Sequence, residues 1–238
     1  MIASFFRKNK EKKEAAAAPR KICLFGGTFD PVHLGHLRMA EKACMKFSLD
    51  EMIFMPSGDP YLKTGVSPDE DRLEITKRSV SDYIHDDKAL WSVSDMEIKR
   101  EGETYTFETI AELKTIYPGD QLYFLVGEDS LRYMEHWKDP QLIFADCIVI
   151  AAARPSRNSQ RFDDSGHEIT GSGERNVERI EDLQARLMRM FPAEIHIMDF
   201  SDNISSSDIR NAIREGRGIS DYVTASAEAY IKDRGMYQ

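Results

Sequence analysis

The chain has 238 residues, of which 41% are hydrophobic and 31% are charged. At roughly 150 residues per domain, this length suits one large domain or two small ones, and the composition is that of an ordinary globular protein. It argues against fibrous, disordered and membrane-spanning proteins. The 32 basic side chains are outnumbered by 41 acidic ones, and the net charge of −9 argues against a non-specific nucleic-acid binder. A phosphate-rich ligand would therefore need local positive potential.

The cysteines and the first residues indicate where the protein works. Cys23, Cys44 and Cys147 are odd in number and lack C-x-x-C spacing, so neither a disulfide framework nor a zinc knuckle is expected. In residues 1–20 the apolar stretch precedes the basic run, which is the wrong order for a secretory signal. No run of 18 apolar residues is found, so no membrane span is expected. We expect a cytoplasmic protein with a disordered basic tail over 1–20.

From residue 21 onward, short β-branched apolar runs alternate with longer stretches of helical period, which is the pattern of βαβ units. The runs are too continuously apolar for a sheet with one solvated face. The pattern predicts strands at 22–26, 52–56, 89–93, 122–127, 147–152 and 195–199. It predicts helices near 36–47, 68–83, 106–116, 174–190, 206–215 and 223–233. We expect an α/β fold, a doubly wound parallel sheet forming one domain over 21–238.

Residues 154–173 interrupt this alternation. The segment is rich in Ser, Gly, Asn and Asp, which predicts a mobile loop. Long loops in compact domains are often functional, so a lid over a site and a passive insertion are both open.

The first predicted strand leads directly into GGTFDPVHLGH, which begins at Gly26. Ligands of doubly wound sheets bind at such strand-to-helix connections. Gly26 and Gly27 lack Cβ, so that their N–H groups can approach a phosphate closely, and a helix starting near Leu34 would point its positive end the same way. An anion site is predicted here.

Two histidines follow these glycines. His33 and His36 are three residues apart across the first helical turn, so both imidazoles lie on one side of it. No third ligand follows at zinc spacing, so no protein-bound metal site is expected. The segment is also no G-x-x-x-x-G-K-[ST] phosphate loop, because no Lys follows the glycines.

This stretch resembles the first motif of the H-x-G-H nucleotidylyltransferase superfamily, and ISSSDIR at 204–210 resembles its second motif, I-S-S-T-x-[IVL]-R. Physically, Ser205 or Ser206 is a good N-cap for a helix, with Asp208 in its first turn. Arg210 could then reach back and grip a phosphate with both arms of its guanidinium. On its own the segment is equally an ordinary capped helix. The superfamily implies a Rossmann-like nucleotidylyltransferase fold.

The middle of the chain is similar to the bacterial nicotinate-nucleotide adenylyltransferases. Four stretches carry that similarity: PSGDPYLK followed by DRLEIT, SDMEIKREGETYTFETIAELK, GEDSLRYMEHWKD and VTASAEAYIKDRGMY. The resemblance implies that Asp129 touches a ribose, that Trp137 stacks on the pyridine ring, and that Tyr105 and Thr106 line the base pocket. Leu62 stands where the family usually has His, which leaves Lys63 as the only cation there.

The reaction implied transfers AMP from ATP to nicotinate mononucleotide, giving deamido-NAD and pyrophosphate in NAD biosynthesis. We expect His33 and His36 to donate to the transferring phosphoryl group, Lys63 and Arg210 to be charge partners, and Mg²⁺ to be held mainly by phosphate oxygens. The residues assigned to ATP binding are Gly26, Gly27, Thr28, Phe29, Gly35, His36, Ile204, Ser205, Ser206 and Arg210.

Several alternatives stay open from the sequence. The acceptor could be nicotinamide mononucleotide, or another phosphate such as the phosphopantetheine arm in coenzyme A synthesis. Cytidylyl transfer fits less well, since that branch usually shows R-T-x-G-I-S-T-T where this chain has SDNISSSDI. A non-catalytic nucleotide-binding module is the alternative from another class. The sequence does not decide between a monomer and a homo-oligomer.

Overall fold

The computed structural model describes residues 18–58, 65–153 and 178–238. They form a six-stranded sheet, in which every neighbouring pair of strands is parallel, with the order β3-β2-β1-β4-β5-β6. The strands are β1 (Lys21–Gly27), β2 (Glu51–Pro56), β3 (Leu90–Val93), β4 (Gln121–Gly127), β5 (Ile148–Ala153) and β6 (Glu194–Asp199). The predicted doubly wound parallel sheet is confirmed, with all six strands in the predicted places.

The long helices also lie where the period predicts them: α1 (Leu34–Phe47), α2 (Asp69–Asp82), α4 (Thr106–Ile116), α7 (Ile180–Met190), α8 (Ser206–Arg214) and α9 (Ala225–Asp233). Shorter elements were not predicted: α3 (Met96–Lys99), α5 (Glu128–Tyr133), the 3₁₀ turn η1 (Met134–His136) and α6 (Pro140–Asp146). They are too short for a hydrophobic period to show. Residues 1–17 of the predicted tail at 1–20 lie outside the described residues. The whole of the predicted loop at 154–173 also lies outside them.

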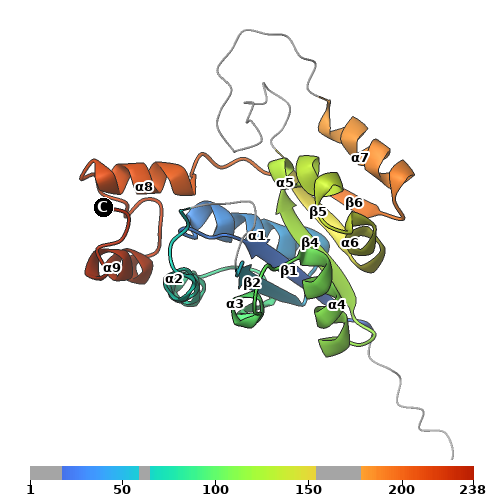
Figure 1. The fold of residues 1–238 in the computed structure, drawn as a ribbon, viewed down its shortest axis with the longest axis horizontal. Coiled ribbons are helices and arrows are strands. Elements are labelled where there is room, and N and C mark those ends of the chain that lie inside the picture. Colours follow the sequence, from blue (N-terminus) through green and yellow to red (C-terminus); the bar gives the residue numbers. More distant parts are fainter. Residues whose placement is uncertain (1–17, 59–64, 154–177) are drawn as a thin grey trace, which may run out of the picture.

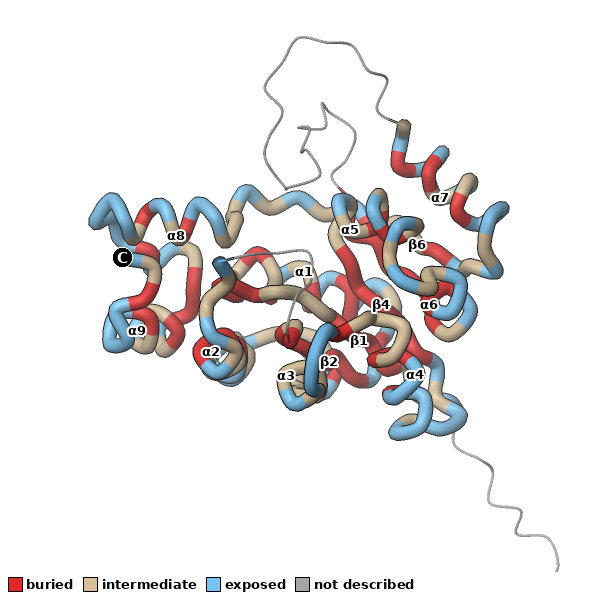
Figure 2. The backbone as a smooth tube through the Cα atoms, in the orientation of Figure 1, coloured by how far each residue is buried: buried red, intermediate tan, exposed pale blue. Residues whose placement is uncertain are grey.

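Two hydrophobic layers cover the two faces of the sheet (Figures 1 and 2). Within β1, the side chains of Cys23 and Phe25 pack with α1, α2, α8 and α9, while those of Ile22 and Leu24 pack with α4, α5, α6 and α7. Because both faces are buried, the strands need apolar residues at successive positions, which explains their uninterrupted apolar runs. No helix in the described parts of the chain is long and apolar enough to cross a membrane.

Strand order reverses beside β1. The chain runs outward from β1 through β2 to β3 and then crosses to β4 on the other side of β1. Connections that leave two neighbouring strands in opposite directions open a crevice at the carboxyl ends of those strands. After β6 at the far edge, the chain passes back across the molecule, so that α8 and α9 lie near α1 and α2 (Figure 1). This return brings the second motif to the first.

Candidate active site

The first motif forms the connection between β1 and α1. Gly26 and Gly27 end β1, and the helix begins at Leu34. A Cβ on Gly35 would lie 3.0 Å from Nδ1 of His33 and 3.2 Å from Cγ of Asp202. Both distances are tighter than an ordinary van der Waals contact, so glycine lets the first turn of α1 approach the segment that leads to the second motif.

The two predicted histidines meet at the start of α1. Their ring centroids are 3.7 Å apart with the planes inclined by 30°. The backbone N–H of His33 donates to Nδ1 of His36 at 3.2 Å, and a neutral imidazole that accepts at Nδ1 carries its proton on Nε2. His36 is therefore arranged as an Nε2–H donor.

His33 is nearly buried at the N-cap of α1. Burial lowers the pKa of its imidazole to about 4, while Asp202 opposes that shift and Arg38 adds to it. The ring is therefore neutral near pH 7. Its Nδ1 is buried and has no hydrogen-bond partner within the described parts of the chain.

The second motif begins α8. Of the two candidate caps, Ser205 is the N-cap, and its Oγ accepts the backbone N–H of Asp208 at 3.1 Å. The hydroxyl also donates to Oδ2 of Asp208 at 2.7 Å. The first residues of this nine-residue helix, whose N–H groups lack partners within the helix, lie next to the first motif.

Direct hydrogen bonds join the two motifs. Oγ of Ser206 donates to the carbonyl of Pro31 at 2.9 Å, and Nη1 of Arg210 donates to the carbonyl of Asp30 at 2.6 Å. Arg210 also donates from Nη2 to Oγ of Ser207 at 3.3 Å. The structure thus brings together the predicted ATP residues of both motifs, and it uses part of the guanidinium of Arg210 to bind the first motif.

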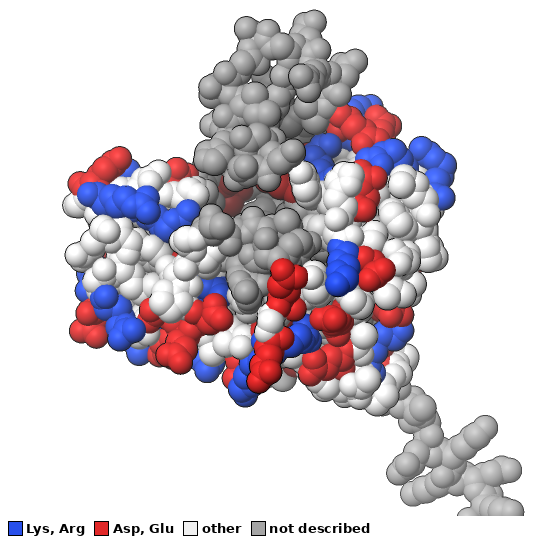
Figure 3. All heavy atoms as spheres, viewed as in Figure 1, with Lys and Arg blue, Asp and Glu red and all other residues white. Residues whose placement is uncertain are grey.

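A hollow of about 270 Å³ lies beside the start of α8. It is lined by Ile204, Ser205 and Asp208 of the second motif and by Arg217 and Tyr222 from the connection to α9. Figure 3 shows basic side chains over α8 on a face where acidic and basic groups otherwise intermingle. Part of the positive charge of this acidic protein thus lies beside the second motif.

The residues predicted to bind the acceptor come from two segments. Tyr105 is the N-cap of α4 and Thr106 its first residue, whereas Trp137 follows η1. Nζ of Lys138 lies 4.1 Å from the centroid of the Tyr105 ring, within the range of a cation–π contact. This contact brings the two segments together. Asp129 lies in the first turn of α5, directly after β4.

The indole of Trp137 is half buried and packs against the core beneath it. Its ring centroid lies 6.2 Å from that of Phe124 in β4. It is neither a fully buried core tryptophan nor a fully exposed surface ring, since it is half buried and packs on Phe124 in the middle of β4.

A partly buried glutamate supports the start of α4. Oγ1 of Thr109 donates to Oε1 of Glu97 at 2.8 Å and accepts from Nη1 of Arg100 at 2.9 Å. Burial raises the pKa of Glu97, while the Thr109 hydrogen bond opposes that shift. Both residues lie in the stretch that resembles the family pattern, but their supporting role was not predicted.

Other residues around the first motif were missed by sequence reasoning. The buried carboxylate of Asp30 accepts from Oη of Tyr237 at 2.8 Å and from the backbone N–H of Ser67 at 3.3 Å. Burial and the nearby Asp30 carboxylate raise the pKa of Tyr237, so its phenol stays protonated and donates. Tyr237 ends the last of the stretches that are similar to the family, but its contact with Asp30 could not be predicted from that similarity.

Two predictions remain, namely Lys63 as a cation for the phosphates and no metal site held by protein side chains. Lys63 lies outside the described residues. In the parts of the chain that the structure describes, no group of three or more His, Cys, Asp or Glu side chains is placed to hold a metal ion.

The fold and the meeting of the two motifs define a nucleotidyltransferase. Residues 24–212 match the cytidylyltransferase-like family, and the chain belongs to it. A probable nicotinate-nucleotide adenylyltransferase of Desulfitobacterium hafniense is 36% identical over 225 residues, 93% of this chain and 98% of the relative. Another from Neisseria meningitidis serogroup B is 34% identical over 220 residues, 92% and 99% of the two chains.

Within the nucleotidyltransferases, the chain thus belongs to the family of nicotinate-nucleotide adenylyltransferases, as the sequence predicts. Among solved structures, Plasmodium falciparum nicotinic acid mononucleotide adenylyltransferase complexed with NaAD is similar in fold, with a TM-score of 0.68 and 18% sequence identity. The match covers 92% of this chain and 97% of the other.

Proposed function

We propose that the protein transfers AMP from ATP to nicotinate mononucleotide, producing deamido-NAD and pyrophosphate. The observation that carries the proposal is the direct bonding of the two motifs, Ser206 to Pro31 and Arg210 to Asp30. It gathers two helix N-termini, two imidazoles and a guanidinium at the carboxyl end of β1. Backbone N–H groups and cations in one place are what a polyphosphate requires.

The chemistry is an in-line displacement at the α-phosphorus of ATP. An oxygen of the acceptor phosphate forms the new P–O bond, and the bond from the α-phosphorus to the bridging oxygen breaks, so that pyrophosphate leaves with the electron pair. A phosphate monoester has a second pKa of about 6, so near neutral pH the nucleophile is already mostly dianionic. No general base is required.

The protein therefore acts by positioning and by charge stabilisation. We assign Nε2–H of His36 to a non-bridging oxygen of the transferring group, and neutral His33 beside it as a second donor. Arg210 and Lys63 supply positive charge to the phosphates, and Mg²⁺ held by phosphate oxygens would neutralise the departing pyrophosphate. The glycines of the first motif and the capped start of α8 contribute backbone N–H groups.

The acceptor is assigned to the surface where the start of α4 meets the segment of Trp137. The indole offers a flat surface on which a pyridine ring can stack, and Tyr105 and Thr106 flank it at the start of α4. The ammonium of Lys138 over Tyr105 puts a positive charge at the same place. A nicotinate ring bears a carboxylate and a nicotinamide ring does not, so this charge favours nicotinate. Asp129 is assigned to a ribose hydroxyl.

The three described cysteines are free thiols and buried, which suits a reducing compartment. We therefore place the reaction in the cytoplasm.

The test is a direct comparison of acceptors. The purified chain is incubated with ATP, Mg²⁺ and either nicotinate mononucleotide, nicotinamide mononucleotide or phosphopantetheine, and dinucleotide and pyrophosphate are measured. We expect the highest kcat/KM with nicotinate mononucleotide. A higher value with either other acceptor would overturn the substrate assignment. ATP binding without release of pyrophosphate from ATP in the presence of any of the three acceptors would favour the non-catalytic module.

A further inference from the structure

An arginine lies at the centre of the buried face of α2. Arg72 has no exposed surface, and its neighbours at helical spacing on that face, Ile75, Thr76 and Ser79, are also buried. A charged side chain is almost never fully buried unless it is paired and hydrogen-bonded. Its partners therefore indicate its purpose.

Those partners are backbone carbonyls from three separate places. Nη1 donates to Thr28 at 2.7 Å, in the first motif. Nη2 donates to Ser57 at 2.7 Å and to Gly58 at 3.2 Å, immediately after β2. Nε donates to Ser67 at 3.0 Å, just before α2. One planar guanidinium thus fixes the first motif relative to two other stretches of backbone.

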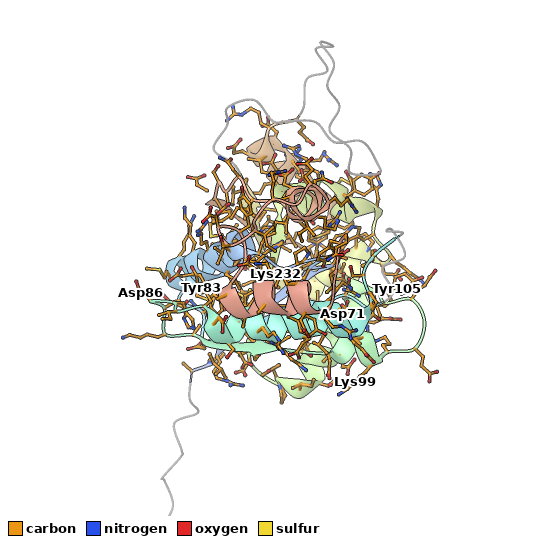
Figure 4. The ribbon with its side chains drawn as sticks, turned by 90° about the vertical axis from the view of Figure 1, so that its left-hand side faces the viewer. Asp71, Tyr83, Asp86, Lys99, Tyr105 and Lys232 are labelled. Atoms are coloured by element: carbon orange, nitrogen blue, oxygen red, sulfur yellow. The ribbon has the colours of Figure 1, made fainter. Side chains whose placement is uncertain are left out.

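Two acidic residues balance the charge of Arg72 and fix the position of α2. The carboxylate of Asp69, one turn earlier, pairs with Nη2 of Arg72. On the outer side of α2, Asp71 accepts from Oη of Tyr230 at 2.8 Å and from Nε of Arg234 at 3.2 Å, so α9 holds α2 in place. Figure 4 shows α9 lying over α2, with Asp71 close to both. The helix that carries Arg72 is therefore held in place by α9.

The carbonyl of Thr28 belongs to a strained stretch of backbone. In its trans peptide unit the carbonyl and the N–H of Phe29 point in opposite directions. Phe29 has φ of 48°, a left-handed conformation that residues with a Cβ seldom adopt. By holding the Thr28 carbonyl, Arg72 holds this peptide unit in its unusual orientation and turns the Phe29 N–H away from α2.

We propose that Arg72 is a positioning residue for ATP: through the Thr28 carbonyl it sets the backbone of the first motif that receives the phosphates. The inference rests on the proposed function, since it assigns Thr28 and Phe29 to ATP. It assigns no contact between Arg72 and substrate. Lysine cannot replace it, because a single ammonium has three donors and no fork geometry.

The experiment compares Arg72→Lys with Thr76→Val. Thr76 is equally buried on the same helix, and its Oγ1 donates to the backbone carbonyl of Arg72. Thr76→Val thus weakens α2 without touching the guanidinium. For each variant, kcat and KM are measured for ATP and for nicotinate mononucleotide, together with the urea midpoint of unfolding.

We expect Arg72→Lys to lower kcat/KM for ATP by about 10²-fold, the scale of a misplaced reacting group. The KM for the acceptor should change less than about twofold. Thr76→Val should keep wild-type kinetics despite a lower urea midpoint. Wild-type kcat/KM for ATP in Arg72→Lys would overturn the inference, and so would equal losses toward both substrates in both variants.

If Arg72→Lys does not fold, Asp69→Asn decides, because the Asp69 side chain is 43% exposed and pairs with the same guanidinium. A raised KM for ATP alone supports the inference, and a wild-type value contradicts it. The measurements distinguish a failure of the proposed function from a failure of the role assigned to Arg72. Absence of dinucleotide synthesis by the wild-type protein removes the proposed function, whereas an active wild type with unchanged variants removes only the role of Arg72.

Discussion

The backbone N–H of His33 donates to Nδ1 of His36 across the first turn of α1. The N-cap residue, which lies outside the helix, thereby fixes the tautomer of a residue inside it, and Nε2 of His36 carries the proton. The bond needs no protonated histidine, so the donor is present throughout the neutral pH range. This hydrogen bond also explains why His33 and His36 are three residues apart. The side chain at the third helical position reaches back to the backbone of the N-cap residue.

Replacing His36 with alanine should lower kcat by about 10²- to 10³-fold, the usual effect of losing one preorganised donor to a transition state. Steady-state assays with both substrates saturating measure it. His196→Ala is the matched control, since His196 is a partly exposed histidine on β6 that pairs with Glu194. An unchanged kcat in His36→Ala would refute the assignment.

Much of the fold could be predicted because the sheet is buried on both faces. Continuous apolar runs such as 22–26 and 147–152 leave few alternatives to buried parallel strands. The short α3, α5 and α6 could not be predicted in this way, since each is held by contacts rather than by a period. Even so, Pro140 directly after Asp139 is a start signal for α6 that could have been read.

The site was predicted where local motifs carry it and missed where distant residues support it. The pairing of His33 with His36 and a serine N-cap at Ser205 or Ser206 follow from spacing and capping, and the structure selects Ser205. Tyr237 and Arg72 act on the first motif from remote positions, which only tertiary structure reveals. Arg72 nevertheless left one signal, since an arginine in line with Ile75, Thr76 and Ser79 interrupts the buried stripe of a predicted helix.

Trp137→Ala should raise the KM for the mononucleotide acceptor more than the KM for ATP. Loss of the indole removes the stacking surface, and base stacking on an aromatic side chain contributes about 1–3 kcal/mol, which is roughly a 5- to 150-fold change in affinity. Each KM is measured with the other substrate saturating. Because the indole also packs on Phe124, Trp137→Phe serves as the control that keeps an aromatic ring. Equal losses for both substrates would contradict the stacking role.

Lys138→Gln should reduce discrimination between the two pyridine nucleotides. The ammonium over Tyr105 attracts the carboxylate of nicotinate and has no net attraction for the amide of nicotinamide. We expect kcat/KM to fall up to about fivefold with nicotinate mononucleotide and to stay within about twofold with nicotinamide mononucleotide, because a charge pair at an exposed lysine contributes at most about 1 kcal/mol. Lys99→Gln, an exposed lysine that pairs with Asp95, provides the baseline. An unchanged ratio between the acceptors would rule out this role for Lys138.

The buried imidazole of His33 should make stability depend on pH in a defined window. Its pKa is about 4 in the folded protein against 6.5 for an ordinary histidine. As the pH falls through that interval, the unfolded chain binds a proton that the folded chain refuses, so the free energy of unfolding decreases. The loss over the whole interval amounts to about 3 kcal/mol. Above about pH 6.5 the contribution is complete and no longer changes.

Urea unfolding of the wild type and of His33→Gln, measured between about pH 7 and pH 4, isolates this contribution. Glutamine keeps a polar side chain at the N-cap and removes the titration. The carboxylates titrate alike in both proteins, so the difference between the two free energies of unfolding reports His33. That difference should shift in favour of the variant as the pH is lowered from 6.5. A difference that is constant over the whole range would mean that His33 titrates normally in the folded protein, and the buried neutral imidazole would have to be abandoned.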